Sequence, residues 1–308
     1  MELGRFAPSP SGRMHLGNVF SALLAWLSAK SQGGEILLRV EDLDPARSRG
    51  EFAEAILEDF AWLGLTWDRR SENQSQRGRA YERAIELLEA REEIYPCYCT
   101  RDQLHAASAP HASDGRVIYA GTCRSLTPLQ RAEKTKKPCL RIHVPKREIS
   151  FVDGLQGRQT MDLARDWGDF IIRRADGVAA YQLAVVVDDG ESGVTQVVRG
   201  RDLLTATSVQ LWLYECLGYP VPQYYHVPML LAPDGRRLSK RDGDLDLGVL
   251  RTRWQPEMLV GYLAFRCGLM DRWEPVTPAE LVGDFSWDRV RKDDISMDSA
   301  VFTPLCGG

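Results

Sequence analysis

Near its N-terminus the chain reads Arg5-Phe6-Ala7-Pro8-Ser9-Pro10-Ser11-Gly12-Arg13-Met14-His15-Leu16-Gly17-Asn18. A short apolar segment there meets a loop of proline, serine and glycine, residues that mark turns. Behind the loop, apolar residues at positions 16, 19, 20, 23, 24 and 27 share one face of a helix, which we expect to close at Gly33. Residues 35–40 then predict a strand and residues 49–63 a second helix. This order predicts the start of a parallel α/β sheet.

His15, Gly17 and Asn18 occupy the expected first turn of that helix. A helix N-terminus has free N–H groups and a positive dipole end, so it favours anions such as phosphate. Gly17 lets a nucleotide approach the backbone closely, and an imidazole at position 15 can donate to a phosphate oxygen. The motif predicts a phosphate site; the alternative is a helix-capping loop that contains an incidental histidine.

The α/β pattern returns in the second half of the chain. We expect strands at 170–173, 181–187 and 196–199, and a helix at 203–217. A basic loop follows, which reads Arg237-Leu238-Ser239-Lys240-Arg241. Lys240 can neutralise the negative charge that develops on a departing pyrophosphate. The alternative is a solvated basic turn.

Four regions follow from these patterns. They are the first half of a Rossmann-like sheet domain (1–90), an insertion (91–165), the second half of the sheet domain (166–235), and the basic loop with a short, mostly helical C-terminal region (236–308). In the last region, Pro256 suits the first turn of a helix and Gly268 the position just past its end.

The composition excludes several classes of protein. The 308-residue chain has 39 Lys and Arg against 43 Asp and Glu, a net charge of −4 and 44% hydrophobic residues, which are globular values and not those of a disordered chain. No run approaches the roughly 20 apolar residues that span a bilayer, and the N-terminus carries no secretory signal. We therefore expect a cytoplasmic protein with no membrane partner. The mild acidity excludes a uniformly basic surface but allows a local basic patch.

Three of the seven cysteines lie close together in the insertion, at Cys97, Cys99 and Cys123. Disulfide frameworks are rare in a reducing compartment, where clustered thiols more often bind metal. Zinc takes a tetrahedral set of sulfur, nitrogen or oxygen ligands. The spacing predicts one structural zinc ion, with buried free cysteines as the alternative. The side chains in the same segment that can complete the set are Tyr119, His105 and His111.

Together, the His-x-Gly-x helix start and the later Leu-Ser-Lys loop resemble the paired HIGH and KMSKS motifs of class I aminoacyl-tRNA synthetases. The opening at residues 5–12 is similar to that of glutamyl-tRNA synthetases. Two further similar segments read Arg39-Val40-Glu41-Asp42-Leu43-Asp44 and Leu63-Gly64-Leu65-Thr66-Trp67-Asp68. The fourth motif position departs from the pattern because it is Asn18 and not histidine, so we leave Asn18 outside the catalytic set.

The length of the chain narrows the set of synthetase families that it resembles. Only 67 residues follow Arg241, too few for the anticodon-binding region of ordinary glutamyl- and glutaminyl-tRNA synthetases. The shortened form with a cysteine cluster resembles the glutamyl-queuosine tRNA(Asp) synthetase family. That resemblance implies activation of L-glutamate with ATP and Mg²⁺ to glutamyl-adenylate, then transfer of glutamate to the queuosine base at the anticodon wobble position of tRNA(Asp). The alternative is a truncated glutamyl-tRNA synthetase that charges a tRNA 3′ end.

The resemblance also implies the site residues. It assigns glutamate binding to Arg5, Phe6, Ala7, Pro8, Ser9, Glu41, Tyr181 and Arg199, ATP binding and catalysis to His15, Gly17 and Lys240, and zinc to Cys97, Cys99, Cys123 and Tyr119. The chemistry suits glutamate, because guanidinium groups bind carboxylates bidentately and Glu41 can pair with an ammonium group. From the residues alone, Arg199 as a surface ion-pair member and Tyr181 as a core ring remain open.

Residues 131–147 carry seven basic residues against one acidic residue, which predicts contacts to RNA phosphates. The alternative is a solvated basic face. Two other functions are possible for this fold: an inactive zinc-containing RNA-binding protein and a small-molecule nucleotidyltransferase. His15 and Lys240 argue against the first, and the basic insertion argues against the second. We expect a monomer.

Overall fold

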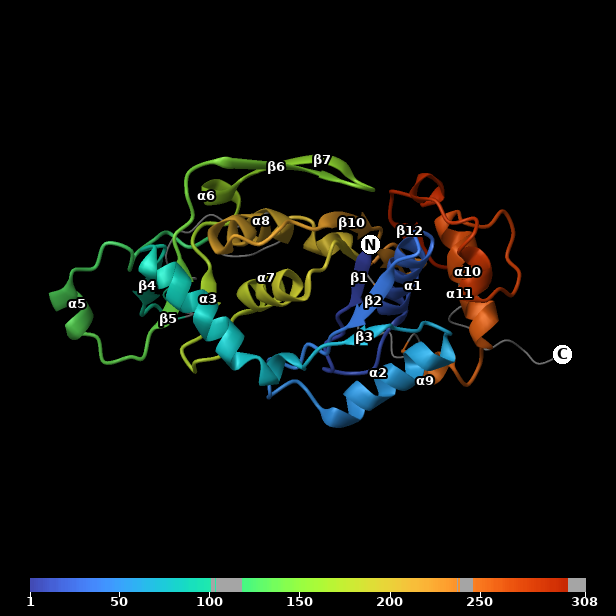
Figure 1. Ribbon diagram of the computed structural model, residues 1–308, viewed down its shortest axis with the longest axis horizontal. Coiled ribbons are helices and arrows are strands. Elements are labelled where there is room, and N and C mark those ends of the chain that lie inside the picture. The colour runs from blue at the N-terminus through green and yellow to red at the C-terminus, as the bar shows by residue number, and fades with distance from the viewer. Residues whose placement is uncertain (101–102, 104–117, 237, 239–245, 299–308) are drawn as a thin grey trace.

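The computed structural model describes residues 1–100, 103, 118–236, 238 and 246–298. Its centre consists of two parallel sheets that lie side by side (Figure 1). The first sheet contains β1 (Leu3–Phe6), β2 (Glu35–Leu38) and β3 (Arg69–Arg70), and the second contains β9 (Gln196–Gly200) and β10 (Gln223–Val227). β1 pairs with β2, β2 with β3, and β9 with β10, all in parallel. The Thr195 amide donates to the Leu3 carbonyl at 3.0 Å, which sets β9 beside β1. The predicted parallel strands with an interruption are confirmed.

Helices cover the sheets in the way that the crossover connections of parallel strands require. They are α1 (Leu16–Lys30), α2 (Gly50–Trp62), α3 (Gly78–Ala90), α7 (Tyr181–Ser192) and α8 (Ala206–Leu217), with short 3₁₀ turns at Gln74–Gln76 and Arg201–Leu203. α1 and α2 fall where the sequence predicted helices. The core lies in two large apolar clusters, one around α1 and one around α7 and α8.

The strand expected at residues 181–187 is wrong, because these residues begin α7. All of Leu183–Val187 is buried, so the apolar run has no polar face from which a helical period can be read. The three consecutive valines favour a strand by propensity, but burial on every side overrides propensity. Gly193, in the left-handed conformation at φ +70°, ends the helix.

The insertion forms two antiparallel sheets. Its elements are β4 (Ile94–Cys97), α5 (Pro128–Ala132), β5 (Cys139–Ile142), the hairpin β6 (Glu148–Asp153) and β7 (Gly157–Asp162), and α6 (Leu163–Asp166). The part with β4 and β5 lies at one end of the molecule, and the β6–β7 hairpin runs from there along α8 toward β10 (Figure 1). The strand expected at 170–173 forms as β8 (Ile171–Arg173), but it pairs with β5 of the insertion and not with the parallel sheets.

The C-terminal part packs at the opposite end. Its elements are β11 (Leu230–Leu231), α9 (Leu247–Leu250), α10 (Pro256–Cys267), α11 (Pro278–Leu281), the 3₁₀ turn Trp287–Arg289 and β12 (Ile295–Ser296). Pro256 begins α10 and Gly268 caps it at φ +94°, as the sequence predicted. The mostly helical character predicted from residue 236 is wrong for the described residues. Aromatic contacts hold much of this part as loop, such as the Tyr225 and Trp287 rings stacked at 4.3 Å.

Within the part of the chain that the structure describes, no helix has the length and apolar character needed to cross a bilayer. This agrees with the hydropathy of the sequence.

Candidate functional site

A cavity of about 290 Å³ opens where β1, β2 and β9 end at their carboxyl termini. Open α/β sheets bind ligands at this edge. The predicted site residues that line it are Arg5, Phe6, Ala7, Pro8, His15, Gly17, Glu41, Tyr181 and Arg199. Ser9 is exposed and is not among the lining residues. Lys240, His105 and His111 lie outside the described residues.

His15 is the residue that precedes the first turn of α1. Its backbone amide donates to Oδ1 of Asn18 at 3.3 Å, so Asn18 caps the helix as expected of a residue outside the catalytic set. A Cβ atom added at Gly17 would lie 3.3 Å from Cε1 and Nδ1 of His15. The imidazole therefore lies over Gly17, and a side chain at position 17 would require the His15 ring to shift by a few tenths of an ångström.

The residues that follow the basic loop contact the segment just before α1. His15 pairs with Asp246 in an antiparallel bridge, and the Leu247 amide donates to the Met14 carbonyl at 2.8 Å. The first described residues after the loop are thus joined to the phosphate-binding motif predicted at His15.

Arg5 and Glu41 enter the cavity from the ends of β1 and β2. Nη1 of Arg5 donates to the Val198 carbonyl at 3.2 Å, and its Nε lies 3.6 Å from Asp189. Nη2 of Arg39 donates to Oε1 of Glu41 at 3.1 Å. Burial raises the pKa of Glu41, although the positive charges of Arg39 and Arg5 act to lower it. A cationic ligand group beside Glu41 would favour its ionised form.

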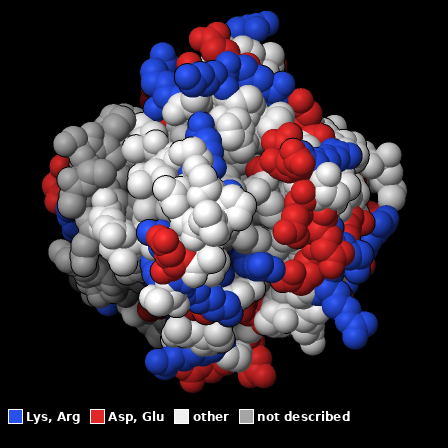
Figure 2. Space-filling view, turned by 90° about the vertical axis from the view of Figure 1, so that its left-hand side faces the viewer, with Lys and Arg blue, Asp and Glu red and all other residues white. Residues whose placement is uncertain are grey.

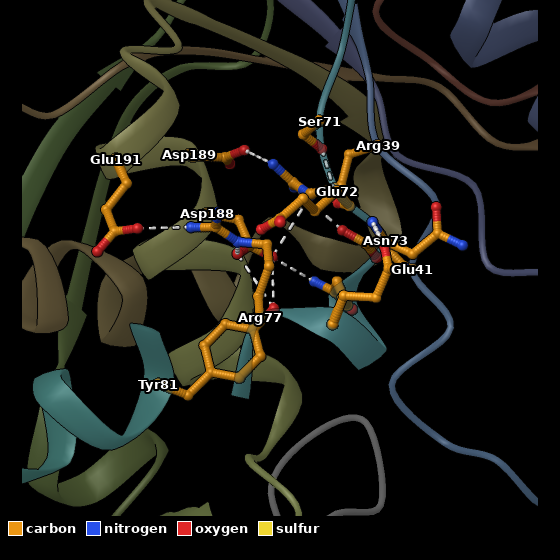
Figure 3. Close-up of polar contacts among 12 residues, drawn as sticks. Arg39, Glu41, Ser71, Glu72, Asn73, Arg77, Tyr81, Asp188, Asp189 and Glu191 are labelled. Carbon is orange, nitrogen blue, oxygen red and sulfur yellow. Dashed lines mark hydrogen bonds and ion pairs between the residues drawn. The ribbon is translucent and has the colours of Figure 1, made fainter. Parts of the chain in front are cut away.

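A buried ionic network lies behind Glu41 (Figure 3). Arg39 is fully buried, with Nη1 2.6 Å from Asp189 and Nε 3.6 Å from Asp188. Asp188 also accepts from Nε of Arg77 at 2.6 Å and from the Tyr81 hydroxyl. Burial and the charge of Asp188 raise the pKa of Tyr81 far above its ordinary value, so the hydroxyl stays protonated and donates. The network ties β2 and α3 to α7.

Arg199 faces the cavity from the end of β9, with only 6% of its surface exposed. Its Nε donates to Nε2 of His226 at 3.0 Å, and its Nη2 donates to the Thr207 hydroxyl at 2.9 Å. The guanidinium carbon lies 5.0 Å from the centre of the Tyr224 ring. The surface ion pair considered for Arg199 is therefore wrong. Tyr181 is 39% exposed at the cavity, so its alternative as a core ring is also wrong.

The cavity thus presents two guanidinium groups and one carboxylate beside a helix N-terminus. This arrangement suits a small ligand with anionic groups and one cationic group, next to a phosphate. Comparison with known proteins agrees, because residues 3–299 match the family described as tRNA synthetases class I (E and Q), catalytic domain. The chain belongs to this family. It is a class I tRNA synthetase, which makes it a ligase.

Curated relatives of the synthetase carry two different names. The glutamyl-Q tRNA(Asp) synthetase of Symbiobacterium thermophilum is 47% identical over 323 residues, which cover 100% of this chain and 99% of that protein. The glutamate–tRNA ligase 2 of Alkalilimnicola ehrlichii is 44% identical over 84% of this chain but only 57% of its own length. A glutamate tRNA ligase from Elizabethkingia meningosepticum, solved in complex with its amino acid, superimposes with a TM-score of 0.83 at 27% identity, over 98% of this chain and 68% of that one.

The insertion of the synthetase gathers the three predicted cysteines. Their sulfur atoms all lie within 4.8 Å of one another, with Cys99 and Cys123 3.6 Å apart. The hydroxyl of Tyr119 lies 3.4 Å from the sulfur of Cys97 and 3.8 Å from that of Cys99. Cys139 is close by, but its sulfur donates to the Cys97 carbonyl at 3.4 Å and is not part of the cluster.

The cluster has the dimensions of a tetrahedral site. With Zn–S near 2.3 Å and Zn–O near 2.1 Å, the edges of a tetrahedron measure about 3.8 Å between sulfurs and about 3.6 Å between sulfur and oxygen. The distances from Tyr119 to Cys97 and to Cys99, and the distance between Cys99 and Cys123, are close to these values. The three cysteines could therefore hold a metal ion, with the Tyr119 hydroxyl within reach of the same site.

The basic segment of the synthetase, residues 131–147, divides into two groups. Arg141 is buried with its guanidinium 3.9 Å from the Tyr119 ring centre, Arg147 pairs with Glu215, and Lys136 donates to the Cys99 carbonyl at 2.7 Å. Lys134, Lys137 and Lys146 are exposed. On the face formed by this end of the molecule, Lys and Arg gather in separate groups, with Asp and Glu between them (Figure 2). The Lys and Arg side chains visible on that face do not form one continuous positive patch (Figure 2).

Several residues around the cavity were not found from the sequence: Arg39, Asp188, Asp189, Asp153 and His226. One signal was available in the sequence, because two aspartates follow the apolar run 183–187 directly. Carboxylates that are buried next to such a run need a partner of opposite charge. The partner, Arg39, lies about 150 positions earlier in the chain, and no local pattern connects the two.

Proposed function

We propose that this synthetase activates L-glutamate with ATP and transfers it to the queuosine base in the anticodon of tRNA(Asp). The observation that carries the proposal is the cavity in which Arg5, Arg199 and Glu41 converge. Glutamate has two carboxylates and one ammonium group, which match two guanidinium groups and one carboxylate in number and sign. Arg5 and Arg199 each bind one carboxylate, Glu41 binds the ammonium, and Tyr181 supplies a hydroxyl.

ATP lies beside glutamate at the start of α1. His15 and the N-terminus of α1 bind phosphate oxygens, and Gly17 leaves room for the nucleotide. Lys240 stabilises the charge of the departing pyrophosphate, a charge that Mg²⁺ shares when it is bound with ATP. The α-carboxylate attacks the α-phosphorus, which releases pyrophosphate and leaves glutamyl-adenylate. The chain contributes position and charge to this step and no covalent intermediate.

The transfer to queuosine is supported by the relatives. The chain matches 99% of the length of the Symbiobacterium glutamyl-Q tRNA(Asp) synthetase but only 57% of the Alkalilimnicola glutamate–tRNA ligase. The second candidate, charging of a tRNA 3′ end, is favoured by the name of that ligase and by the likeness to a solved glutamate tRNA ligase.

One assay separates the two candidates. [¹⁴C]Glutamate is incubated with ATP and tRNA(Asp), with and without queuosine, and the labelled RNA is mapped by nuclease digestion. We expect label in the anticodon loop, and only on tRNA that contains queuosine. Label at the 3′ end would favour the second candidate and overturn the proposal.

Activation is tested separately through Lys240. Loss of one donor to a developing charge typically lowers a rate by about 10²–10³. We expect Lys240→Ala to lower glutamate-dependent ATP–pyrophosphate exchange by that factor. Unchanged exchange would remove Lys240 from the mechanism.

We also propose that Cys97, Cys99, Cys123 and Tyr119 hold one structural zinc ion. All four positions of the tetrahedron are then taken by the protein, which leaves no position for a reacting water. Metal analysis of purified Cys99→Ser is expected to show loss of zinc, while Cys139→Ser retains one equivalent. Tyr119→Phe is expected to bind zinc more weakly. A full equivalent of zinc in Cys99→Ser would contradict this assignment.

A further inference from the structure

Arg199 is held by a chain of buried polar side chains that begins in the insertion. Asp153, at the tip of the β6–β7 hairpin, is 1% exposed. Its Oδ2 lies 2.6 Å from Nδ1 of His226, a fully buried residue of β10. Nε2 of His226 faces Nε of Arg199 at 3.0 Å. Asp153, His226 and Arg199 thus form a continuous path from the hairpin to the cavity.

Asp153 is fixed in place by the backbone around it. Its Oδ1 accepts from the amides of Leu155 at 3.1 Å, Gln156 at 2.8 Å and His226 at 3.2 Å. These bonds and the one to Nδ1 lower the pKa of Asp153, although burial acts to raise it. The carboxylate is therefore ionised, and among the described residues its Oδ2 has a single partner, the His226 ring.

The contacts of His226 allow one tautomer. Burial lowers the pKa of His226 to about 4, so the ring is neutral. Asp153 can only accept, which puts the ring proton on Nδ1. Arg199 Nε can only donate, which requires the lone pair on Nε2. The contacts with Asp153 and Arg199 are both satisfied by the same tautomer, with the proton on Nδ1. The Thr207 hydroxyl, 3.2 Å from Nε2, can donate to the same lone pair.

The consequence is seen at Arg199. His226 holds Nε, and Thr207 holds Nη2 at 2.9 Å. Nη1 has no hydrogen-bond partner among the described residues, and Arg199 lines the cavity. Two fixed nitrogens in a planar group fix the direction of the third.

We propose that Asp153 and His226 are positioning residues for glutamate binding: Asp153 selects the Nδ1–H tautomer of His226, and the lone pair on Nε2 then fixes Arg199 in the orientation that binds a glutamate carboxylate. This inference rests on the proposed function, since it names the residues that prepare the same site. It also gives the insertion a part in amino-acid binding through the hairpin tip.

The decisive variant is Asp153→Asn. Three backbone amides keep the side-chain oxygen of the new residue at the Oδ1 position, so its NH₂ group points at Nδ1 of His226. The ring then moves its proton to Nε2, where an N–H meets the N–H of Arg199. We expect the KM for glutamate in ATP–pyrophosphate exchange to rise about tenfold or more, since a charged hydrogen bond is worth roughly 1.5–3 kcal/mol, while the KM for ATP stays within about twofold. Asp176→Asn is the matched control, because Asp176, like Asp153, accepts from a backbone amide and from a side-chain donor, here Arg174, but it is exposed.

A spectroscopic measurement on the free protein tests the tautomer without any activity. Nitrogen-15 NMR of labelled histidine distinguishes Nδ1–H from Nε2–H. We expect the Nδ1–H form for His226 in the unsubstituted protein and the Nε2–H form in Asp153→Asn. If the unsubstituted protein does not activate glutamate, the proposed function fails, whereas the NMR result still decides the tautomer.

A second pair of variants keeps the test sharp if Asp153→Asn folds poorly. His226→Gln keeps an acceptor oxygen within reach of Nε of Arg199, whereas His226→Asn keeps only a donor near Asp153. We expect a smaller rise in glutamate KM for His226→Gln than for His226→Asn. An Nε2–H ring in the unsubstituted protein, an unchanged glutamate KM in Asp153→Asn, or equal effects of the two His226 variants would each overturn the proposal.

Discussion

Two buried arginines beside the same cavity are neutralised in different ways. Arg39 contacts three carboxylates directly, those of Glu41, Asp188 and Asp189. In the part of the chain that the structure describes, Arg199 contacts only neutral acceptors directly: the His226 ring, the Thr207 hydroxyl and, more distantly, the Leu203 carbonyl at 3.5 Å. Its carboxylate, Asp153, is on the far side of the imidazole.

This difference in partners indicates a structural role for Arg39 and a ligand-binding role for Arg199. The charge of Arg39 is matched inside the protein, so little of it remains for a ligand. Arg199 keeps hydrogen-bonding capacity and positive charge at the cavity, which an anionic ligand can use. Burial alone does not distinguish the two residues, but the identity of their partners does.

The largest expected effect is on stability, for Arg39→Met. Removal of one partner from a buried ion pair costs about 3–5 kcal/mol, because the remaining charges lose their compensation. We expect a loss of that size in the free energy of unfolding, measured with urea at pH 7. Arg165→Met, which removes an exposed arginine paired with Asp166, is the control and should change stability by less than about 1 kcal/mol. If Arg39→Met lowered the free energy of unfolding by less than about 1 kcal/mol, the structural role that distinguishes Arg39 from Arg199 would be contradicted.

The matching substitution, Arg199→Met, is expected to act on binding. Since hydrogen bonds to a charged group are worth roughly 1.5–3 kcal/mol, the KM for glutamate should rise about 10- to 100-fold. The loss of stability should be smaller than in Arg39→Met, because the partners left behind are neutral. Exchange kinetics and urea denaturation on the same preparation check both points. A large loss of stability with an unchanged glutamate KM would mean that Arg199 is structural as well.

The pH dependence of stability tests the neutral His226. Its pKa is about 4 in the folded protein against an ordinary 6.5, so unfolding takes up a proton between these values. Stability contributed by His226 is therefore complete above pH 6.5 and falls as the pH falls toward 4, by up to about 1.4 kcal/mol per pH unit. His226→Gln should show a shallower slope in this window when urea denaturation is repeated across it. Equal slopes would show that His226 is not held neutral.

The smallest effect is expected in the basic segment, residues 131–147. This segment also contains one basic residue that is ion-paired within the protein and another whose charge is available to a ligand. Arg147 is paired within the protein, whereas Lys137 has no ion-pair partner in the described part of the chain. Lys137→Ala should weaken tRNA binding about twofold to fivefold and reduce the slope of log affinity against log salt by about one. The control is Arg272→Ala, an ion-paired arginine in the segment that follows α10 in the chain. α10 lies at the end of the molecule opposite α5 (Figure 1). An equal effect of both substitutions would place the tRNA elsewhere.

The sequence predicted the local elements well and the remote contacts poorly. α1 and the ends of α10 carry their signals within a few residues: a proline and glycine loop, a regular apolar face, Pro256 and Gly268. The segment at 181–187 failed because burial on all sides removes the periodic pattern that identifies a helix.

The prediction of the residues around the cavity was limited in the same way. Nine of the cavity's lining residues were predicted, because the resemblance to a known family named them as site residues. The residues that orient them were not found, because Asp153 and His226 meet across 73 positions and Arg39 and Asp189 across 150. Such pairs depend on how the sheet brings its two halves together, and a short stretch of sequence does not contain that information.

A crystal structure with L-glutamate and a non-hydrolysable ATP analogue tests the central claim most directly. We predict one carboxylate of glutamate on the guanidinium of Arg199, the other on Arg5, and the ammonium group at Glu41, with the nucleotide phosphates at the start of α1. Glutamate bound elsewhere, or bound in the cavity without contact to Arg199, would contradict the account.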